Sequence, residues 1–592
     1  MATLATLGTV ALLGLPNPAQ AAGKTPGKYV AGDFHNHTTC SDGSTSLQKL
    51  VKKATDKNKT PWGLDWLVQA GHGGNGNRHC TLAEDSTLDE PAYPFVTGQG
   101  PSTTWAASIG AGNVKGNVGG SNTTPLASQA NPSMWRWQSV QEFSYPVTEY
   151  LSARKNMPIF MGLESVVAGH EHSSMSVISG QLPRAVDLAV LPNTPGYTPL
   201  GNATALAQWS YCFDRGDIDN SGDGGQAWNC AVNSSANATD PSWSATAAKL
   251  MPAGGNGTGN RGHAKTVESV KWMVQNHPNA SDYIPAHLER AGPFNPDGNN
   301  GFNIEHLRNF NNAGPQVAFG FETQPGHGAS GDRGEYRPER NSIGGVLVDS
   351  VGGTTYGGTG VYGAQVGGVW DALLGEGRNF WFFASSDWHN RGSFGSDDRR
   401  STQDFYPGEY QRNYTLVRNG SDKLRPQAIV DGLRSGNNFA ASGQIIDRLA
   451  FVACASYRGP AMRSDASVEA LALAAATGQT DVDQPGCASM GEKLVVRPGA
   501  NIVVAIVVRD PSGEIVSPYG FDNPSLKHVG AGRHHGHGLD HGRWRHAEDD
   551  AAHSGGDGVA VPAAAWQQSA GGGALRDRHQ WQPAGRRAHQ RT

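Results

Sequence analysis

Six short apolar segments in this sequence are each followed within a few residues by a histidine or an acidic residue. Segments with helical periodicity lie between them, and alternating strands and helices favour a parallel sheet. In a barrel of parallel strands, the active site is built from the carboxyl ends of the strands. The sequence therefore predicts an α/β barrel with its functional residues at the strand ends. The segments cover residues 29–32, 63–70, 157–163, 282–286, 316–321 and 380–384, and the residues that follow them are His35, His72, Glu164, His287, Glu322 and Asp387.

The first segment leads into Asp33-Phe34-His35-Asn36-His37, with Asp42 a few residues later. Side chains at positions i and i+2 of an extended stretch point the same way, so His35 and His37 are expected on one side of the chain. Ser44 is a candidate N-cap for a helix whose apolar residues fall at 47, 50, 51 and 54. Two imidazoles with a nearby carboxylate predict a metal site. The alternative is a loop with two surface histidines.

Two large polar insertions interrupt the predicted barrel, at about 75–131 and 180–262. The second contains Asp217, Asp219 and Ser221, followed by Gly222, which is the ligand spacing of the first half of a calcium loop. The twelfth position is Trp228, so the usual bidentate glutamate is missing. A plain acidic loop closed by a disulfide is the alternative interpretation.

The N-terminus and the cysteines indicate export. Residues 1–22 contain an apolar run and a small-x-small cleavage site, which predict a signal peptide, although no Lys or Arg precedes Lys24. The six cysteines fall into neighbouring pairs, and we expect sequential disulfides. Cys40 is also a candidate metal ligand. The expected pairs are Cys40–Cys80, Cys212–Cys230 and Cys454–Cys487.

The net charge and the hydropathy give no indication of nucleic-acid binding or of a membrane span. The net charge of −5 gives no indication of a protein held to nucleic acid by basic residues. No later run reaches the ~18 apolar residues that a membrane span needs. The high glycine content favours a loop-rich enzyme that contains β-structure.

The sequence pattern changes after residue 447. Short β-type runs separated by a turn predict a small β-sandwich-like module over 448–523. Residues 524–592 are expected to be disordered, because from 528 onward they contain no Ile, Phe, Tyr, Met or Lys. This tail holds nine of the 21 histidines, so metal binding is one interpretation. Our preferred interpretation is coding sequence read out of frame.

Together, the His35-Asn36-His37 and Ser41-Asp42-Gly43 motifs, the later strand-end residues and the closing Ser386-Asp387-x-His389 resemble the polymerase and histidinol phosphatase (PHP) family of metal-dependent phosphoesterases. The resemblance is to an exported, largely uncharacterised branch and covers about 29–447. It implies a distorted (β/α)7 TIM-like barrel with large loop insertions over 28–447. It also implies a cluster of two or three divalent ions.

The resemblance further implies how the ligands are divided. His35, His37, Glu164 and Asp387 would hold the first ion, and Glu164 would bridge to a second ion completed by His172 and His287. Asp42, His72 and His389 would hold a third. His170, His277 and His327 compete for the places in the second set. We prefer His172 because it stands on the strand side of residues 173–178, and His287 because it ends an apolar run, whereas His277 ends a helix.

Closely spaced metals held by nitrogen and carboxylate lower the pKa of a bound water to near neutrality, and the hydroxide can then attack phosphorus. Arg290 and Arg391 follow predicted ligands and are candidates for phosphate binding, with ordinary salt bridges as the alternative. His327 is a candidate proton donor to the leaving oxygen. Mixed histidine and carboxylate ligands suit Zn, Mn or Fe.

We therefore expect an exported, metal-dependent hydrolase that acts on a small-molecule phosphate ester. Two other functions remain open. The first is a metallohydrolase of a C–N or C–O bond, because a metal-bound hydroxide also attacks carbonyl carbon. The second is a non-catalytic, metal-containing binding protein.

Overall fold

The computed structural model describes most of the predicted barrel and the module that follows it. The described residues are 24–41, 43, 45–57, 63–71, 113, 136–165, 174–178, 201–214, 226, 228–230, 232, 261–288, 302–325, 341–343, 346–348, 359–389, 406–409, 411–418, 425–441, 446–456, 464–498, 500–509, 559–560 and 563–566.

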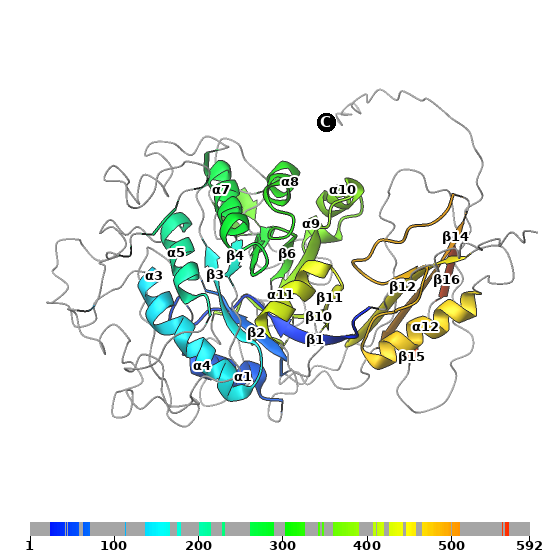
Figure 1. The fold of residues 1–592 in the computed structure, drawn as a ribbon, viewed down its shortest axis with the longest axis horizontal. Helices are drawn as coiled ribbons and strands as arrows, with labels where there is room; N and C mark the ends of the chain where they lie inside the picture. The colour runs from blue at the N-terminus through cyan, green and yellow to red at the C-terminus, as the bar shows by residue number, and fades with distance from the viewer. Residues whose placement is uncertain are drawn as a thin grey trace, which may run out of the picture.

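The central feature is a seven-stranded mixed sheet with the strand order β11-β10-β1-β2-β3-β4-β5 (Figure 1). Strands β1, β2 and β3 are parallel, whereas β10, β11, β4 and β5 join through antiparallel pairs. The strands are β1 (Gly27–Asp33), β2 (Trp66–Gln69), β3 (Ile159–Ser165), β4 (Ser174–Ile178), β5 (Ser281–Ile284), β10 (Arg412–Arg418) and β11 (Asn438–Ala441).

A second sheet consists of two parallel strands, β6 (Gly320–Pro325) and β9 (Trp381–Ser385). It lies against the first sheet, since the backbone N–H of Ala384 donates to the side-chain oxygen of Asn413 at 2.9 Å. A small hairpin, β7 (Asn341–Ile343) and β8 (Val346–Val348), completes this part. The fold is thus mixed α/β with parallel strands, as predicted. The expectation of wholly parallel strands is wrong, and the described residues show no closed barrel.

Helices flank the strands. They are α1 (Leu47–Thr55), α3 (Arg136–Ser139), the π-helix η4 (Val140–Ser144), α4 (Tyr145–Lys155), α5 (Ala203–Phe213), α7 (Arg261–Asn276), α8 (Ile304–Ala313), α9 (Val361–Ala364), α10 (Val369–Gly375) and α11 (Pro426–Ser435). The apolar stripe predicted for α1 is buried. Its N-cap is Ser46, whose side chain accepts from the backbone N–H of Lys49, and not Ser44 as predicted.

A π-helical turn interrupts the helical segment before β3. Pro146 lies in the first turn of α4, where it has no backbone N–H to donate. The five-residue π-helix η4 directly precedes α4. The interruption therefore takes the form of a local widening of the helix.

One glycine at the end of β1 determines how closely β2 approaches. A Cβ atom at Gly32 would lie only 1.9 Å from the indole ring of Trp66, which is fully buried. Trp66 and Phe34 belong to the same buried core cluster, which also includes Val68 and Phe383. Tight packing beside Gly32 therefore supports the chain where β1 leads into its histidines.

The C-terminal module is a sheet of antiparallel strands covered by one long helix (Figure 1). It comprises β12 (Arg448–Ser456), α12 (Asp465–Gly478), β13 (Cys487–Ala488) and β14 (Asn501–Arg509). The second sheet of the predicted sandwich does not occur among the described residues, and α12 takes its place. Residues 494–496, inside the predicted module, are irregular chain. Two short strands, β15 (Val559–Ala560) and β16 (Ala563–Trp566), pair with β14 inside the tail that we expected to be disordered.

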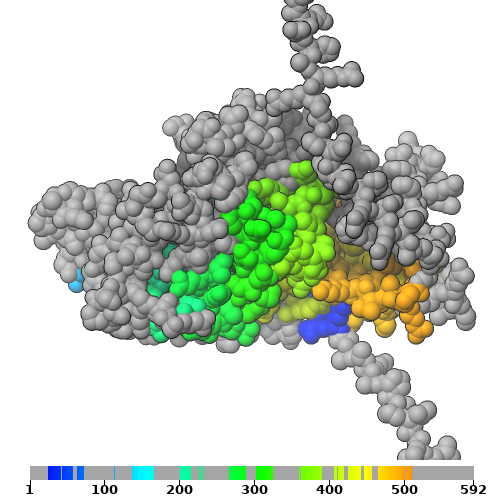
Figure 2. All heavy atoms as spheres, turned by 90° about the horizontal axis from the view of Figure 1, so that it is seen from above, coloured from blue at the N-terminus to red at the C-terminus, as the bar shows by residue number. Residues whose placement is uncertain are grey.

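The module contacts the beginning of the chain (Figure 2, where blue residues adjoin orange ones). The backbone N–H of Tyr29 donates to the carbonyl oxygen of Gln479 at 2.9 Å, and the Thr480 hydroxyl donates to the carbonyl oxygen of Gly27 at 2.6 Å. Lys24 also pairs with Glu492 at 2.7 Å. Strand β1, which leads to the candidate metal site, is thus attached to the module at its other end.

Two of the predicted disulfides are present. Cys212–Cys230 and Cys454–Cys487 are bonded, and Cys40 is disulfide-bonded as well, whereas its expected partner Cys80 lies outside the described residues. A disulfide-bonded sulfur is not a metal ligand, so the alternative role of Cys40 is excluded. Disulfides form and persist in oxidising environments, so their presence indicates that this protein folds in an oxidising compartment. None of the helices in the described part of the chain is both long and apolar enough for a membrane span.

Candidate metal centre

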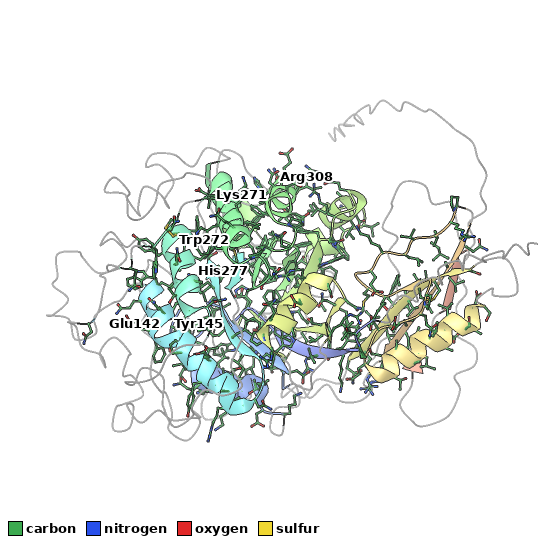
Figure 3. The ribbon with its side chains drawn as sticks, in the orientation of Figure 1. Glu142, Tyr145, Lys271, Trp272, His277 and Arg308 are labelled. Carbon is green, nitrogen blue, oxygen red and sulfur yellow. A yellow bond between two sulfur atoms is a disulfide. The ribbon has the colours of Figure 1, made fainter. Side chains whose placement is uncertain are left out.

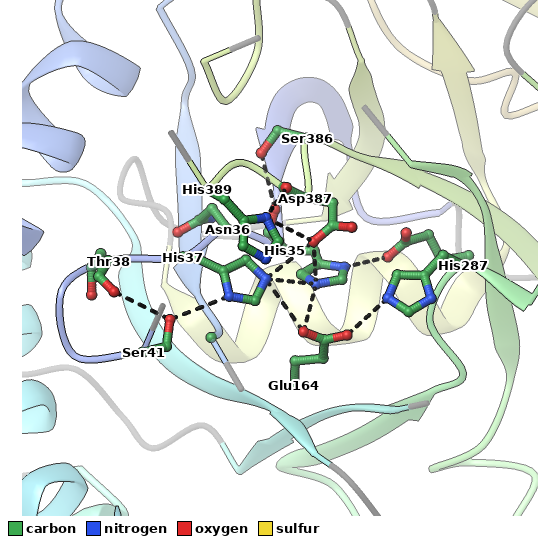
Figure 4. Close-up of polar contacts among 12 residues, drawn as sticks. His35, Asn36, His37, Thr38, Ser41, Glu164, His287, Ser386, Asp387 and His389 are labelled. Carbon is green, nitrogen blue, oxygen red and sulfur yellow. Dashed lines mark hydrogen bonds and ion pairs between the residues drawn. The ribbon is translucent and has the colours of Figure 1, made fainter. Parts of the chain in front are cut away.

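Four predicted ligands meet at one point in the structure. His35 and His37 follow β1, Glu164 lies near the end of β3, and Asp387 follows β9. One ligand atom from each residue lies within 4.8 Å of the others, and all four residues are buried. Figure 4 shows the two imidazoles and two carboxylates facing one another. Three strand ends that are distant in sequence thus supply a single polar site.

The spacing of the donor atoms suits one cation. Oδ1 of Asp387 lies 3.0 Å from Nε2 of His35 and 3.1 Å from Nε2 of His37. Oε2 of Glu164 lies 3.3 Å from both of these nitrogens, which are also 3.3 Å apart. Ligands at roughly 2.0–2.1 Å from a tetrahedral zinc ion lie roughly 3.3 Å apart. The donor set therefore matches a four-coordinate ion in number, type and spacing.

A backbone network fixes the chain on both sides of these ligands. The carboxylate of Asp33 accepts hydrogen bonds from the backbone N–H groups of His35 and Ser386 and from the amide of Asn36. The carbonyl oxygen of His35 accepts from the Ser386 hydroxyl and from the N–H of Asp387, both at 2.9 Å. Burial raises the pKa of Asp33 to about 7, although these hydrogen bonds oppose the rise. The ends of β1 and β9 are thus joined through the interior.

Two residues of the site have strained backbones. Asp387 has φ 43° and His287 has φ 27°, which lie in the left-handed region that residues other than glycine rarely adopt. Such conformations cost of order 1–3 kcal/mol each and cluster at functional sites. Here the strain occurs at two predicted ligands.

The buried histidines and carboxylates of this group shift each other's pKa values toward the charged forms. Burial would lower the pKa of His35, but Asp387, Glu322 and Glu164 together raise it well above its usual value. Burial would raise the pKa of Glu164, but the charge of His35 and hydrogen bonds from His287, His35 and His37 hold it well below its usual value. A proton between the ligands therefore occupies the place that a metal cation would take, and metal binding would release it.

Glu164 also reaches a fifth predicted ligand. Its Oε1 accepts from Nε2 of His287 at 2.8 Å, while Oε2 faces His35 and His37. The two carboxylate oxygens thus point to different histidines (Figure 4). A carboxylate in this position has the geometry of a bridging ligand.

His389 lies on the other side of His37. Their rings stack with centroids 3.7 Å apart and an interplanar angle of 18°. Nδ1 of His389 donates to the carbonyl oxygen of Asp387 at 2.8 Å, which assigns the proton to Nδ1 and leaves Nε2 as the nitrogen able to bind a cation. The structure thus brings together six of the nine predicted ligands.

The remaining predicted site residues lie outside the described part of the chain. They are the ligands Asp42, His72 and His172, the competing His170 and His327, the cationic Arg290 and Arg391, and the calcium candidates Asp217, Asp219 and Ser221. His277 is described and lies at the end of α7 (Figure 3). Its ring packs near Trp272 at 5.6 Å, and burial lowers its pKa. His277 is not part of the four-residue group.

Sequence reasoning missed two supports of the site. Glu322 was recognised only as a strand-end residue, yet its Oε2 lies 2.7 Å from Nδ1 of His35. Arg136 was not recognised at all. Its guanidinium is buried, pairs with Asp214 and donates to the carbonyl oxygens of Gly71 and Glu164. No sequence pattern marks it, because its partners lie on distant segments.

The donor set can hold a divalent cation. Two imidazoles and two carboxylates suit Zn, Mn or Fe. A metal bound here could act as a Lewis acid or activate a water molecule. Searches of protein-family models, curated proteins and solved structures found no match to this chain.

Proposed function

We propose that this protein is an exported, metal-dependent phosphoesterase of the PHP type. The observation that carries the proposal is the buried convergence of His35, His37, Glu164 and Asp387 on one point. Support for export comes from the signal-like residues 1–22 and from the disulfides. Support for a phosphate ester as substrate comes from the sequence resemblance.

In this proposal, His35, His37, Glu164 and Asp387 would hold the first ion, and Glu164, His287 and His172 would hold a second. His389 would hold a third with Asp42 and His72. Such ions, which would be Zn, Mn or Fe, would supply a nucleophile near neutral pH and stabilise negative charge on the phosphoryl oxygens.

The protein's own residues position the reaction. Asp33 holds the backbone after β1 and after β9, so the ligands from the two sheets keep their spacing. Arg290 and Arg391 bind the phosphate oxygens through their planar guanidinium groups. His327 carries a proton to the leaving oxygen.

The test is hydrolysis of a panel of phosphomonoesters and phosphodiesters by the full chain, with Asp387→Ala as the inactive variant. We expect hydrolysis that chelator abolishes, that added metal restores and that the variant lacks. Metal-loaded protein that hydrolyses no phosphoester would contradict the proposal. Hydrolysis of amide or carboxylic ester panels would then identify an enzyme acting on C–N or C–O bonds.

A further inference from the structure

Glu322 lies directly behind His35. It is on β6, is fully buried and makes a 2.7 Å contact through Oε2 to Nδ1 of His35. The other imidazole nitrogen, Nε2, faces Asp387 and Glu164. Glu322 therefore touches the first ligand on the side away from the candidate metal.

The contact determines which nitrogen of His35 carries a proton. A carboxylate oxygen only accepts hydrogen bonds, so Nδ1 must be the donor in this pair. In a neutral imidazole the lone pair then lies on Nε2, toward Asp387. Metal-bound histidines commonly donate their second N–H to a carboxylate, which fixes the ring and makes it a stronger ligand.

The backbone of β6 fixes the position of Glu322. Its backbone N–H donates to the carbonyl oxygen of Pro285 at 2.8 Å, which ties β6 to the segment leading to His287. The pairing of β6 with β9 shifts register between Glu322 and Gln324. Such a bulge redirects the side chains beside it. Local backbone geometry therefore fixes where the carboxylate of Glu322 points.

We propose that Glu322 is a positioning residue that holds His35 in the Nδ1–H tautomer, so that Nε2 is ready for a divalent cation. The inference rests on the proposed metal centre and adds a residue outside the ligand set. Glu322 acts through His35 and not by touching the metal, because the His35 ring lies between its carboxylate and the convergence point.

The experiment compares three full-length variants by zinc competition against a chromophoric chelator. Glu322→Leu keeps much of the volume but removes the acceptor, and we expect it to bind zinc about 10–100-fold more weakly. Glu322→Gln keeps a carbonyl acceptor for Nδ1–H, and we expect less than a tenfold loss. The control Glu149→Gln changes a buried carboxyl group on α4 that accepts a hydrogen bond from the backbone N–H of Gly201. We expect its zinc affinity to equal that of the parent.

A second readout separates positioning from folding. In the zinc-loaded parent, NMR of labelled histidine should show one slowly exchanging imidazole proton on Nδ1 of His35, assigned with His35→Gln. Glu322→Leu should lose this signal, whereas Glu322→Gln should keep it. Parent-like zinc affinity and an unchanged Nδ1–H signal in Glu322→Leu would overturn the inference. A parent that binds no divalent metal would instead overturn the proposed function.

Discussion

The strand ends at the metal centre and the C-terminal module both have buried interiors, but they bury different kinds of side chain. In the module, α12 covers β12 and β14, and the buried cluster consists of alanine, valine and the half-cystine Cys454. At the metal centre, the ends of β1 and β3 in the main sheet and of β9 in the β6–β9 sheet bury histidines and carboxylates instead. Burying ionisable groups is costly unless they are paired or bind a metal. Among the described residues, the strand ends at the metal centre therefore have a polar interior that packing alone does not explain.

The two regions also differ in how their geometry is fixed. The module relies on apolar burial and on Cys454–Cys487. The metal centre relies on hydrogen bonds that the carboxylates of Asp33 and Glu322 accept, and on strained backbone at His287 and Asp387. Substitutions in the centre should therefore change metal binding, whereas substitutions in the module should change stability alone.

The largest effect is expected for Glu164→Gln. The amide replaces the oxygen that faces His35 and His37, and its charge is lost. Metal affinity and phosphoester hydrolysis should each fall by more than the roughly 100-fold typical of an outer partner. Glu469→Gln on α12 is the matched control in the module and should leave both unchanged. Equal losses in the two variants would break the distinction between the regions.

Arg136→Leu should affect both stability and the centre. It removes the partner of the buried Asp214 and the donor to the carbonyl oxygens of Gly71 and Glu164. Breaking a buried ion pair costs roughly 3–5 kcal/mol, and zinc affinity should fall with it. Denaturant unfolding and zinc competition measure the two effects. The double variant Arg136→Leu with Asp214→Leu should regain stability, and a failure to do so would reject the ion-pair explanation.

Opening the disulfide of the module should leave the centre intact. Cys454→Ser with Cys487→Ser removes a bond between residues 33 positions apart, which typically costs roughly 2–4 kcal/mol. Thermal unfolding should shift to a lower temperature while zinc affinity stays within experimental error. A weakened zinc site would show that the contacts of Gly27 and Tyr29 with the module reach the ligands.

The smallest effect concerns a buried acid outside the centre. Burial raises the pKa of Asp282 to about 8, although Arg434 opposes the rise. The folded state therefore keeps a proton that the unfolded chain loses near pH 4, so this group makes the protein less stable as pH rises from about 4 to 8.

Asp282→Asn does not titrate, so its stability relative to the parent should increase over that pH range. We expect little difference near pH 4 and a stability gain that grows as pH rises from about 4 to 8, measured by thermal unfolding across pH. Zinc affinity should not change, because Asp282 is not part of the ligand group. A variant less stable than the parent at pH 8 would contradict the assignment.

The sequence predicted features that depend on local pattern. Apolar runs followed by His35, Glu164, His287 and Asp387 identified strand ends, and six of the nine predicted ligands do lie together. The antiparallel pairing of β4 with β3 and of β10 with β1 could not be predicted, because strand pairing joins segments distant in sequence and leaves no local pattern. Helix α12 was missed because its alanine-rich sequence lies between short β-type runs. The role of Glu322 needed a distance to His35 across the fold.

The most direct test is the metal content of the full chain, purified without chelator and dialysed against metal-free buffer, together with that of Asp387→Ala. Elemental analysis should find two or three Zn, Mn or Fe ions per parent chain and fewer in the variant. Less than one ion per parent chain, or equal content in both proteins, would contradict a metal centre at the ends of β1, β3 and β9.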